Sequence, residues 1–331
     1  MQILDFFAEL IGDLPKLFNQ MPGAVAQGII WGIMAIGVYI TFRILDVSDL
    51  TVDGSFCTGG ATFVVLYTGG VNIWLSLLAA MLAGMIAGFV TGILHTFCGI
   101  PAILAGILTQ LGLYSVNMAI MSMKATVAIP VTNAEVVDQL LVSLRFVKDV
   151  ATGARPFYRH PIFVVGIFTV VIIGILYWFF GTELGCSLRA TGSNPAMARA
   201  QGINTDRAKV LALMIANGLV ALSGALLAQY NSASEINMGR GAIVIGLAAV
   251  IIGEVAFGKI FRNFGLKLLS VSFGGVIYYI VIQAVLAMGL NTNYLKLLSA
   301  VVVAVFLSIP YWKNKYIHAK IPAQKGGNTN A

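Results

Sequence analysis

Few side chains of this 331-residue sequence could do chemistry, and none stands in a catalytic arrangement. His95 has neither a G-x-S motif nor partners at metal-ligand spacing, so an intramembrane hydrolase is not supported. The G-x-x-x-x-G-K-[ST] phosphate loop is absent, so any ATP hydrolysis is expected on a separate chain. The three cysteines lack paired or metal-type spacing and are predicted to be free thiols. We therefore expect no enzymatic activity and no cofactor or metal.

A small set of polar side chains is instead suited to binding or gating a solute. Glu254 is the one acidic residue predicted within an apolar segment, where a central charge costs roughly 2.5–3.5 kcal/mol unless hydrated or paired. Glu254 either acts as a gate or cavity residue or lies at the cytoplasmic edge of its span, about one turn from Lys259. The edge is favoured, because the span ends at Gly258, four residues further on. Asp53 is expected to cap a helix that starts at Gly54, with cation or substrate binding as the alternative. The candidate pathway or gate residues are Asp49, Asp53, Gln110, Asn217, Glu235 and Glu254.

Three of these candidates have open alternatives. Gln110 and Asn217 are placed within apolar segments, where they either face a solute pathway or hydrogen-bond between helices. Glu235 and the nearby Arg240 are expected on the outer side, where they would serve receptor docking or an outer gate.

The most distinctive motif is the segment LRATGSNPAMARAQGI, Leu188–Ile203. Asn194 is a favourable N-cap, Pro195 suits the first helical position, and Gly202 suits the residue after the helix. These positions predict a short helix over Pro195–Gln201, too short to be stable alone in water. Its basic surroundings indicate either a docking element for a soluble partner or an ordinary connecting turn.

The elements that position these residues are predicted to be membrane-spanning helices. The sequence is 59% hydrophobic and 10% charged, whereas roughly 25% of the residues of soluble domains are charged. The net charge of +7 does not indicate nucleic-acid binding, because the chain has no soluble domain to carry that charge. No Lys, Arg, Asp or Glu stands between Asp53 and Lys124, and as a helix that run is roughly 105 Å long, enough for about three crossings. The runs lack the alternation of barrel strands. An all-α polytopic membrane protein is predicted, as one domain over 1–331, with nine spans: Ala24–Phe42, Gly54–Gly70, Val71–Leu94, Pro101–Met123, Pro161–Phe180, Ala208–Gln229, Ala242–Gly258, Leu268–Leu290 and Tyr294–Tyr311.

Basic residues predict the orientation of these spans. The segment Glu183–Lys209, the loop after the seventh span and the C-terminal tail are rich in Lys and Arg, and all three are expected in the cytoplasm. Nine spans then place the N-terminus outside, together with the loop Lys124–His160, whose own basic residues partly conflict with the rule. The first twenty residues predict an interfacial amphipathic helix rather than a cleaved signal peptide.

The span pattern also predicts an internal repeat. An offset of about 186 residues relates a first repeat, 24–123, to a second, 208–311, on either side of the span Pro161–Phe180, which gives an inverted 4+1+4 arrangement. Chance identity in a Gly- and Ala-rich chain is the alternative. Gly84, Gly88 and Gly92 lie on one face of the third span and predict close helix packing, with a dimer seam as the other possibility. The offset pairs Ala26 with Ala212, Gly32 with Gly218, Ala35 with Ala221, Ser48 with Ser234, Asp49 with Glu235, Gly60 with Gly246 and Gly88 with Gly274.

The segment Leu188–Ile203 resembles the coupling loop of ABC-importer permeases of the branched-chain amino acid and ribose class, which reads LRATG-x-NP-x-x-AR-x-x-GI. Ile40–Phe56 resembles the start of the short second helix in the branch that takes up tryptophan and tyrosine. The resemblance implies that residues 182–209 transmit the movement of an ATPase to the spans. Glycines stand in a number of family members where this chain has Gly253-Glu254, so no role for Glu254 follows from the resemblance. The implied ATPase-coupling residues are Arg189, Asn194, Pro195, Arg199 and Gly202.

The resemblance further implies the partners and the substrate class. We expect a cytoplasmic ABC ATPase dimer and an external substrate-binding protein or lipoprotein. In the bacterial inner membrane we expect a second permease subunit, which forms a homodimer or a heterodimer with this chain, the homodimer being favoured. The substrate is expected to be a small polar solute, an amino acid and first of all an aromatic one. The alternatives are a sugar or nucleoside importer of the same class and an ion-coupled secondary transporter, which inverted repeats also fit.

Overall fold

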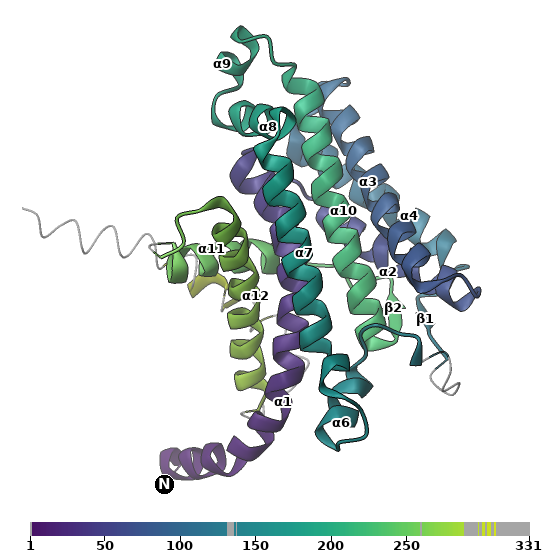
Figure 1. The fold of residues 1–331 in the computed structure, drawn as a ribbon, viewed down its shortest axis with the longest axis vertical. Coiled ribbons are helices and arrows are strands. Elements are labelled where there is room, and N and C mark those ends of the chain that lie inside the picture. Colours follow the sequence, from purple (N-terminus) through teal and green to yellow (C-terminus); the bar gives the residue numbers. More distant parts are fainter. Residues whose placement is uncertain are drawn as a thin grey trace, which may run out of the picture.

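The computed structural model describes residues 2–130, 136, 138–258, 260–287, 297, 300, 301, 303–305 and 308, with side chains from residue 20 onward. The described chain is mostly helical, as predicted (Figure 1). The helices are α1 (Gln2–Tyr39), α2 (Val52–Thr68), α3 (Ile73–Thr96), α4 (Ala102–Ile120), α6 (Leu144–Ala151), α7 (Pro161–Gly181), α8 (Glu183–Ser193), α9 (Pro195–Ala200), α10 (Thr205–Asn231), α11 (Ala242–Phe257) and α12 (Phe264–Ala287). A π-helical turn, Ile40–Ile44, extends α1, and the strands β1 (Thr126–Ala128) and β2 (Ala233–Glu235) pair antiparallel.

Six helices in the described part of the chain are long and apolar enough to cross a membrane. They include α3, α4, α7, α10, most of α12, and the stretch Gln20–Ile44 that joins α1 to the π-helical turn. The two spans predicted to be short are short helices, α2 with 17 residues and α11 with 16. The predicted ninth span, Tyr294–Tyr311, lies largely outside the described residues, as does the C-terminal tail. The nine-span count and the 4+1+4 repeat therefore stay predictions.

The break between α2 and α3, which no charged residue marks in the sequence, is made by backbone geometry. Gly70 has φ +87°, a left-handed conformation that glycine adopts at no steric cost. Two residues on, the side chain of Asn72 accepts a hydrogen bond from the backbone N–H of Trp74 at 2.9 Å and caps α3. A glycine turn and an N-cap together end one helix and begin the next.

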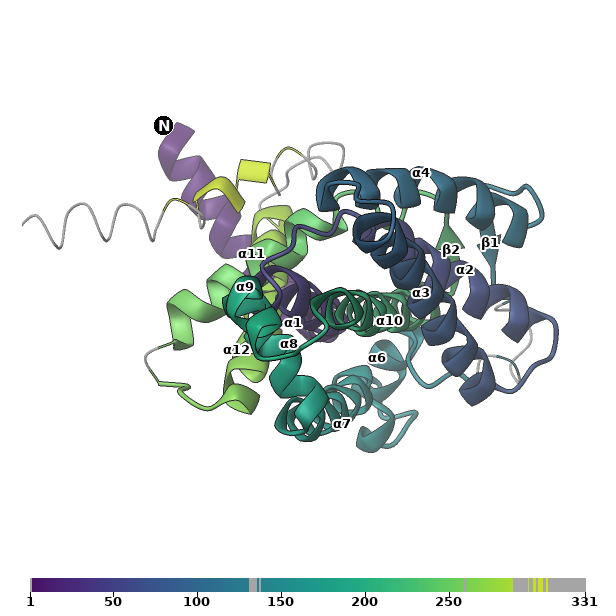
Figure 2. The same ribbon diagram turned by 90° about the horizontal axis from the view of Figure 1, so that it is seen from above.

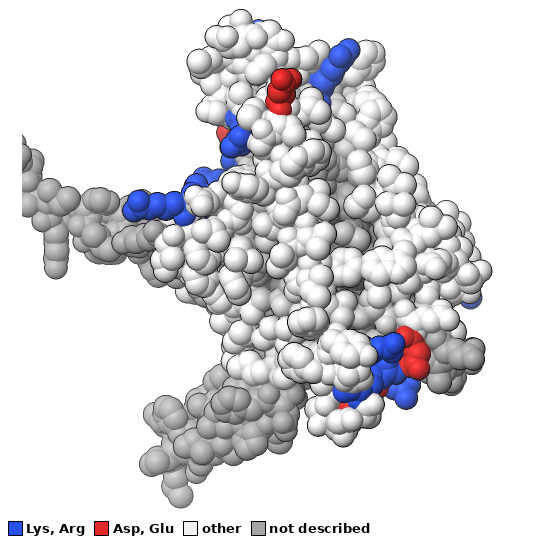
Figure 3. Space-filling view, in the orientation of Figure 1, with Lys and Arg blue, Asp and Glu red and all other residues white. Residues whose placement is uncertain are grey.

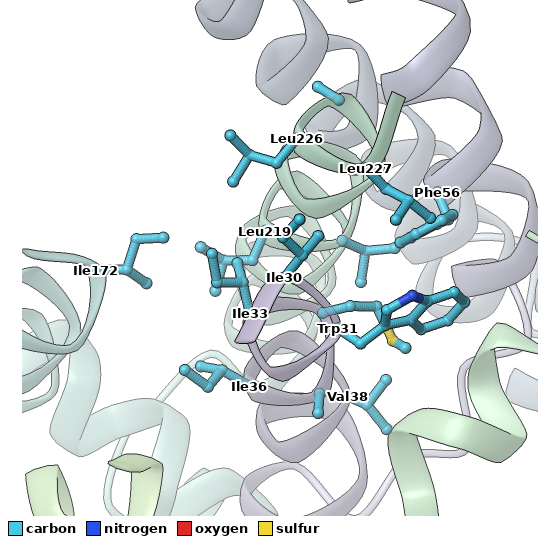
Figure 4. Packing of buried hydrophobic residues seen from close by; sticks show 14 of the residues in the cluster. Ile30, Trp31, Ile33, Ile36, Val38, Phe56, Ile172, Leu219, Leu226 and Leu227 are labelled. Atoms are coloured by element: carbon cyan, nitrogen blue, oxygen red, sulfur yellow. The ribbon is translucent and has the colours of Figure 1, made fainter. Parts of the chain in front are cut away.

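The helices are arranged around a central pair. Figure 2 shows α1 and α10 in the middle, with α11 and α12 on one side and α2, α3 and α4 on the other. The most extensive packing joins α10 to α3 and α1 to α12. The predicted repeat would relate α1 to α10 and α3 to α12, so the two pairs would correspond to each other. Buried apolar side chains of α1, α2, α7 and α10 fill the centre (Figure 4). Within it the ring of Trp31 stacks on Phe56 at 4.8 Å.

The glycine ladder of α3 packs within the chain rather than forming a dimer seam. A Cβ on Gly84 would lie 2.4 Å from the carbonyl oxygen of Asn217, and one on Gly88 2.3 Å from that of Leu213. Both contacts lie on α10, as does the contact of Gly92 with Val210. The small residues therefore let the two helix backbones approach closely, which is how membrane helices associate. The packing interpretation is confirmed and the alternative is wrong for this face.

We predict that Gly88→Ala destabilises the protein by about 1–3 kcal/mol, because its methyl group would overlap the α10 backbone. Thermal unfolding in detergent, followed by tryptophan fluorescence, measures the effect. Gly112→Ala in α4 is the matched control, since a Cβ there has nothing within 4 Å and alanine favours a helix by up to about 1 kcal/mol. Equal unfolding temperatures for the two variants would contradict the packing argument.

The molecule has two distinct ends. Figure 1 shows α8 and α9 at one end and α6, β1 and β2 at the other, where the first part of α1 turns aside. The first twenty residues, predicted as an interfacial amphipathic helix, are helical from Gln2 and continuous with the first span, and their place at the interface stays a prediction. Two of the basic segments predicted to share a side do so, since the Arg189 guanidinium lies 6.0 Å from the Phe264 ring at the start of α12.

Candidate functional site

Most of the predicted candidates fall into three groups, and Glu235 and Glu254 lie apart from them. The first group is a buried polar network at the start of α2. Asn217 of α10 donates from Nδ2 to Oδ2 of Asp49 at 2.7 Å and accepts from Oγ of Ser55 at 2.7 Å. Asp49 also accepts the backbone N–H of Thr51 at 2.9 Å. Asp49 is 2% exposed, and this burial raises the pKa of its carboxyl above the ordinary value, while the bonds from Thr51 and Asn217 act in the opposite direction.

The network extends across the subunit through hydroxyl groups. The Thr51 and Thr91 hydroxyls lie 2.7 Å apart, and Thr91 donates to Thr109 at 2.9 Å. The chain of bonds therefore joins α2, α3, α4 and α10. For Asn217 the geometry supports hydrogen bonding between helices rather than a place in a solute pathway. Its amide is fully buried and donates to the Asp49 carboxylate and to the backbone carbonyl of Leu213.

The second group lines a cavity of about 240 Å³ between α2, α4 and the segment before α11. Asp53 and Gln110, predicted as pathway residues, both line it, and so does Arg240. The cavity therefore carries one acidic and one basic side chain together with amides and an aromatic ring. Its lining residues are Asp53, Gly54, Cys57, Gln110, Leu111, Tyr114, Asn117, Ile236 and Arg240.

The predicted role of Asp53 as the cap of its own helix is wrong. α2 begins at Val52, its N-cap residue Thr51 makes no side-chain cap bond, and Asp53 lies within the first turn. The carboxylate instead accepts the backbone N–H groups of Gly241 at 2.9 Å and Ile243 at 3.0 Å, at the start of α11. Asp53 thus caps a helix 190 residues away in sequence, where the positive end of the helix dipole favours its charge.

We predict that Asp53→Ala destabilises the protein by about 2 kcal/mol, because two partly buried N–H groups at the start of α11 lose their acceptor. Asp53→Asn keeps one acceptor oxygen and is expected to lose about half as much. Chemical denaturation in detergent measures both variants. An Asn variant less stable than the Ala variant would show that the cap does not act through these hydrogen bonds.

Sequence reasoning missed the polar residues Tyr114 and Asn117 of this cavity. Gln110, Tyr114 and Asn117 follow one another at i, i+4 and i+7 and therefore share one face of α4. Only Gln110 was identified, although the polar spacing of the three was readable. Asn117 donates to the carbonyl oxygen of Gly54 at 3.3 Å, and its own side-chain oxygen is buried without a partner among the described residues.

Two candidates lie apart from this cavity. Glu235 is in β2 and exposed, although its backbone carbonyl accepts from the Cys57 thiol. Glu254 lies near the end of α11 and pairs with Arg43, the Nε–Oε1 distance being 2.9 Å. The side chain of Glu254 is 35% exposed, which supports the edge interpretation; the expected neighbour Lys259 lies outside the described residues.

The third group is the α8–α9 segment, in which the predicted short capped helix is confirmed as α9, while the preceding helix α8 was not predicted. Asn194 accepts the backbone N–H of Met197 at 3.0 Å and caps α9, with Pro195 at the first helical position. Gly202 follows the helix with φ +81°. Arg199 donates from Nε to the Thr205 hydroxyl at 2.9 Å, which ties α9 to the start of α10.

Arg189 lies away from the α9 turn. Its guanidinium donates to the backbone carbonyl oxygen of Phe180 at 2.8 Å and to the Cys186 sulfur at 3.3 Å. It therefore satisfies a carbonyl at the end of α7, where a positive charge also complements the helix dipole. The three cysteines are free, as predicted, with Cys57 buried and Cys98 and Cys186 exposed.

These features define a class: a polytopic helical membrane protein with short helices meeting at an internal polar cavity and a small capped helix protruding at one end. Residues 21–307 match the family described as the branched-chain amino acid transport system / permease component, and the chain belongs to that family. It is thus a permease component of an ABC-type transport system and not a catalytic enzyme, and the family implies an ATPase and a substrate-binding partner. The match decides against the ion-coupled secondary transporter.

Relatives agree with this assignment. The chain is 36% identical to a tyrosine transport system permease protein of Clostridioides difficile, over 86% of this chain and 89% of that one. It is 33% identical to an uncharacterized protein of Rickettsia prowazekii, over 88% and 97% respectively, and 24% identical to a fructose import permease of Bifidobacterium longum, over 78% and 68%. The solved structure of PsaBC from Streptococcus pneumoniae in complex with Fab has a similar fold, with a TM-score of 0.50, 16% identity, and coverage of 95% of this chain and 99% of that one.

Proposed function

We propose that the protein is the membrane subunit of an ATP-driven importer, and that its α8–α9 segment receives the movement of a cytoplasmic ATPase dimer. The observation that carries the proposal is α9 itself: a six-residue helix, capped at Asn194 and ended at Gly202, that protrudes at one end of a chain of the permease family. So short a helix is unstable alone and is held by its neighbours. A structure held in this way suits a contact that must transmit force.

The side that faces the ATPase follows from the distribution of charge. Several basic side chains lie at the α8–α9 end, and we assign that end, with the C-terminus, to the cytoplasm. The opposite end, with α6, then faces outward, toward an external substrate-binding protein. The described basic residues near the α8–α9 end are Arg43, Arg189, Arg199, Arg207, Lys209, Arg262 and Lys267.

The substrate that best fits the cavity between α2 and α4 is an amino acid. In the cavity, the guanidinium group of Arg240 complements the carboxylate of an amino acid, and the carboxylate of Asp53 complements its ammonium group. Tyr114 adds an aromatic ring, which supports an aromatic side chain on the substrate, in line with the tyrosine permease relative. A sugar or nucleoside would use the amides of Gln110 and Asn117 but would offer no carboxylate to Arg240.

A permease of this kind is expected to act as a pair of subunits, and we propose a homodimer. The outer faces of α4 and α7 are apolar, with only 22% of their most hydrophobic windows buried inside the subunit. Exposed apolar faces of this size are covered by lipid or by a second subunit. A homodimer would use part of this surface and leave the rest to the bilayer.

The test is co-expression with a candidate ABC ATPase and uptake of labelled tyrosine into proteoliposomes. We expect the ATPase to copurify and ATP to drive uptake. Met197→Asp places a charge on the 63% exposed side chain of α9 and is expected to abolish both. Met123→Asp, at a 74% exposed site before β1, is the matched control and is expected to change neither. ATP-independent uptake, or copurification that Met197→Asp leaves intact, would overturn the proposal.

A further inference from the structure

A second cavity, separate from the proposed solute path, lies at the base of the α8–α9 segment. Its volume is about 510 Å³, and four cations line it: Arg43, Arg189, Arg262 and Lys267. Figure 3 shows basic side chains gathered in the recess between the α8–α9 end and the part of the molecule formed by α11 and α12. Arg43 pairs with Glu254, but among the described residues no carboxylate pairs with the other three. The site therefore holds a surplus of positive charge.

The geometry of one wall is fixed. The Arg189 guanidinium is held by its bond to Phe180 and lies 6.0 Å from the ring of Phe264, which also lines the cavity. α8 is pressed against the π-helical turn, since a Cβ on Gly192 would lie 1.7 Å from the carbonyl oxygen of Ile44. One cation is thus positioned in advance, whereas Arg262 and Lys267 are exposed and free to close on a ligand.

The cavity lies at the depth where the spans end. The stretch Gln20–Ile44 ends at it, the span Pro161–Gly181 ends beside Arg189, and the span from Phe264 begins at it. Next to the basic residues stand exposed apolar ones, Ile260 at 70% and Leu266 at 39% exposure. Charge at the ends of spans with apolar surface beside it is the pattern of a lipid headgroup site on the cytoplasmic side. α9 protrudes beyond this level (Figure 1), so an ATPase seated on α9 would leave the cavity beside the bilayer.

We propose that this cavity binds the phosphodiester headgroup of an anionic phospholipid. The arginines offer forked N–H donors that match two phosphate oxygens, and Lys267 adds a point charge. The acyl chains would lie against the apolar side chains that flank the recess. The site is independent of the cavity that contains Asp53 and of the proposed transport of an amino acid.

The experiment measures lipid binding to the detergent-purified full chain by native mass spectrometry and by the shift in unfolding temperature. The probes are dioleoylphosphatidylglycerol, dioleoylphosphatidylcholine with the same chains, and inorganic phosphate. The test variant carries Arg262→Gln and Lys267→Gln. The control carries Arg207→Gln and Lys148→Gln, which remove the same charge from exposed sites outside the cavity. The exchange Arg262→Lys with Lys267→Arg keeps the charge.

We expect the phosphatidylglycerol affinity of the test variant to fall about 30-fold, because each basic side chain near an anionic headgroup contributes about fivefold. The control and the exchange variant are expected to bind within about twofold of the unchanged protein, which excludes a folding defect as the cause. Equal binding of phosphatidylcholine, or an equal loss in the control, would overturn the site. Stabilisation by inorganic phosphate that matches phosphatidylglycerol would show a soluble anion site instead and overturn the lipid assignment.

Discussion

Replacing Asn217 by leucine is expected to destabilise the subunit by about 4 kcal/mol and to abolish transport with it. The amide of Asn217 satisfies two buried groups, the carboxylate of Asp49 and the hydroxyl of Ser55, each at 2.7 Å. Leucine fills a similar volume but satisfies neither, and a buried polar group without its partner costs about 1–3 kcal/mol, more when it carries charge. Loss of thermal stability in detergent, together with loss of folded protein on size exclusion, measures the effect.

The matched variants separate hydrogen bonding from packing. Asp49→Asn replaces the charge by an amide at the same site and is expected to cost less than Asn217→Leu, because an amide is easier to bury. Combining Asn217→Leu with Asp49→Leu removes both partners, so the double variant is expected to be more stable than the sum of the single variants predicts. Additive losses would mean that the two side chains do not act as a pair.

The long apolar helices were readable from the sequence, since composition and the spacing of charges determine them, whereas α6 and α8 were not predicted. The charge-free run after Asp53 predicted three crossings; α2, α3 and α4 occupy it, and of these α3 and α4 are long and apolar enough to cross a membrane. The capped helix α9 was readable as well, because an N-cap, a first-turn proline and a glycine after the helix act over a few residues of backbone. Local rules of this kind need no knowledge of the tertiary fold.

The partners of buried polar groups were not readable, because tertiary packing chooses them. Asp53 stands beside the start of its own helix, yet it caps α11, since the two short helices meet end to end inside the subunit. Arg189 was assigned to the coupling motif by resemblance, yet its guanidinium binds a backbone carbonyl at the end of α7. For Glu254 the sequence offered Lys259, but the structure supplies Arg43, 211 residues away. Pairing at that separation leaves no trace in a single sequence.

Glycine 202 provides the sharpest test of the coupling segment. Gly202→Val is expected to lower ATP-driven uptake by about tenfold or more while leaving overall folding intact. The residue has φ +81°, and a side chain in the left-handed region costs roughly 1–2 kcal/mol, most of all a β-branched one. Since 1.4 kcal/mol is a factor of ten in a population, that cost is enough to unfold the last turn of a six-residue helix.

Two controls make the result specific to this helix. Gly153→Val introduces the same strain at φ +73°, also with nothing within 4 Å, but at the α6 end of the molecule, and it is expected to leave uptake unchanged. Gly202→Asn keeps a residue that tolerates the left-handed region and is expected to retain most of the uptake. If Gly202→Val and Gly153→Val lower uptake equally, the effect is general strain. If Gly202→Val transports normally, the shape of α9 does not transmit the work of the ATPase, and the proposed contact must lie elsewhere on the α8–α9 end.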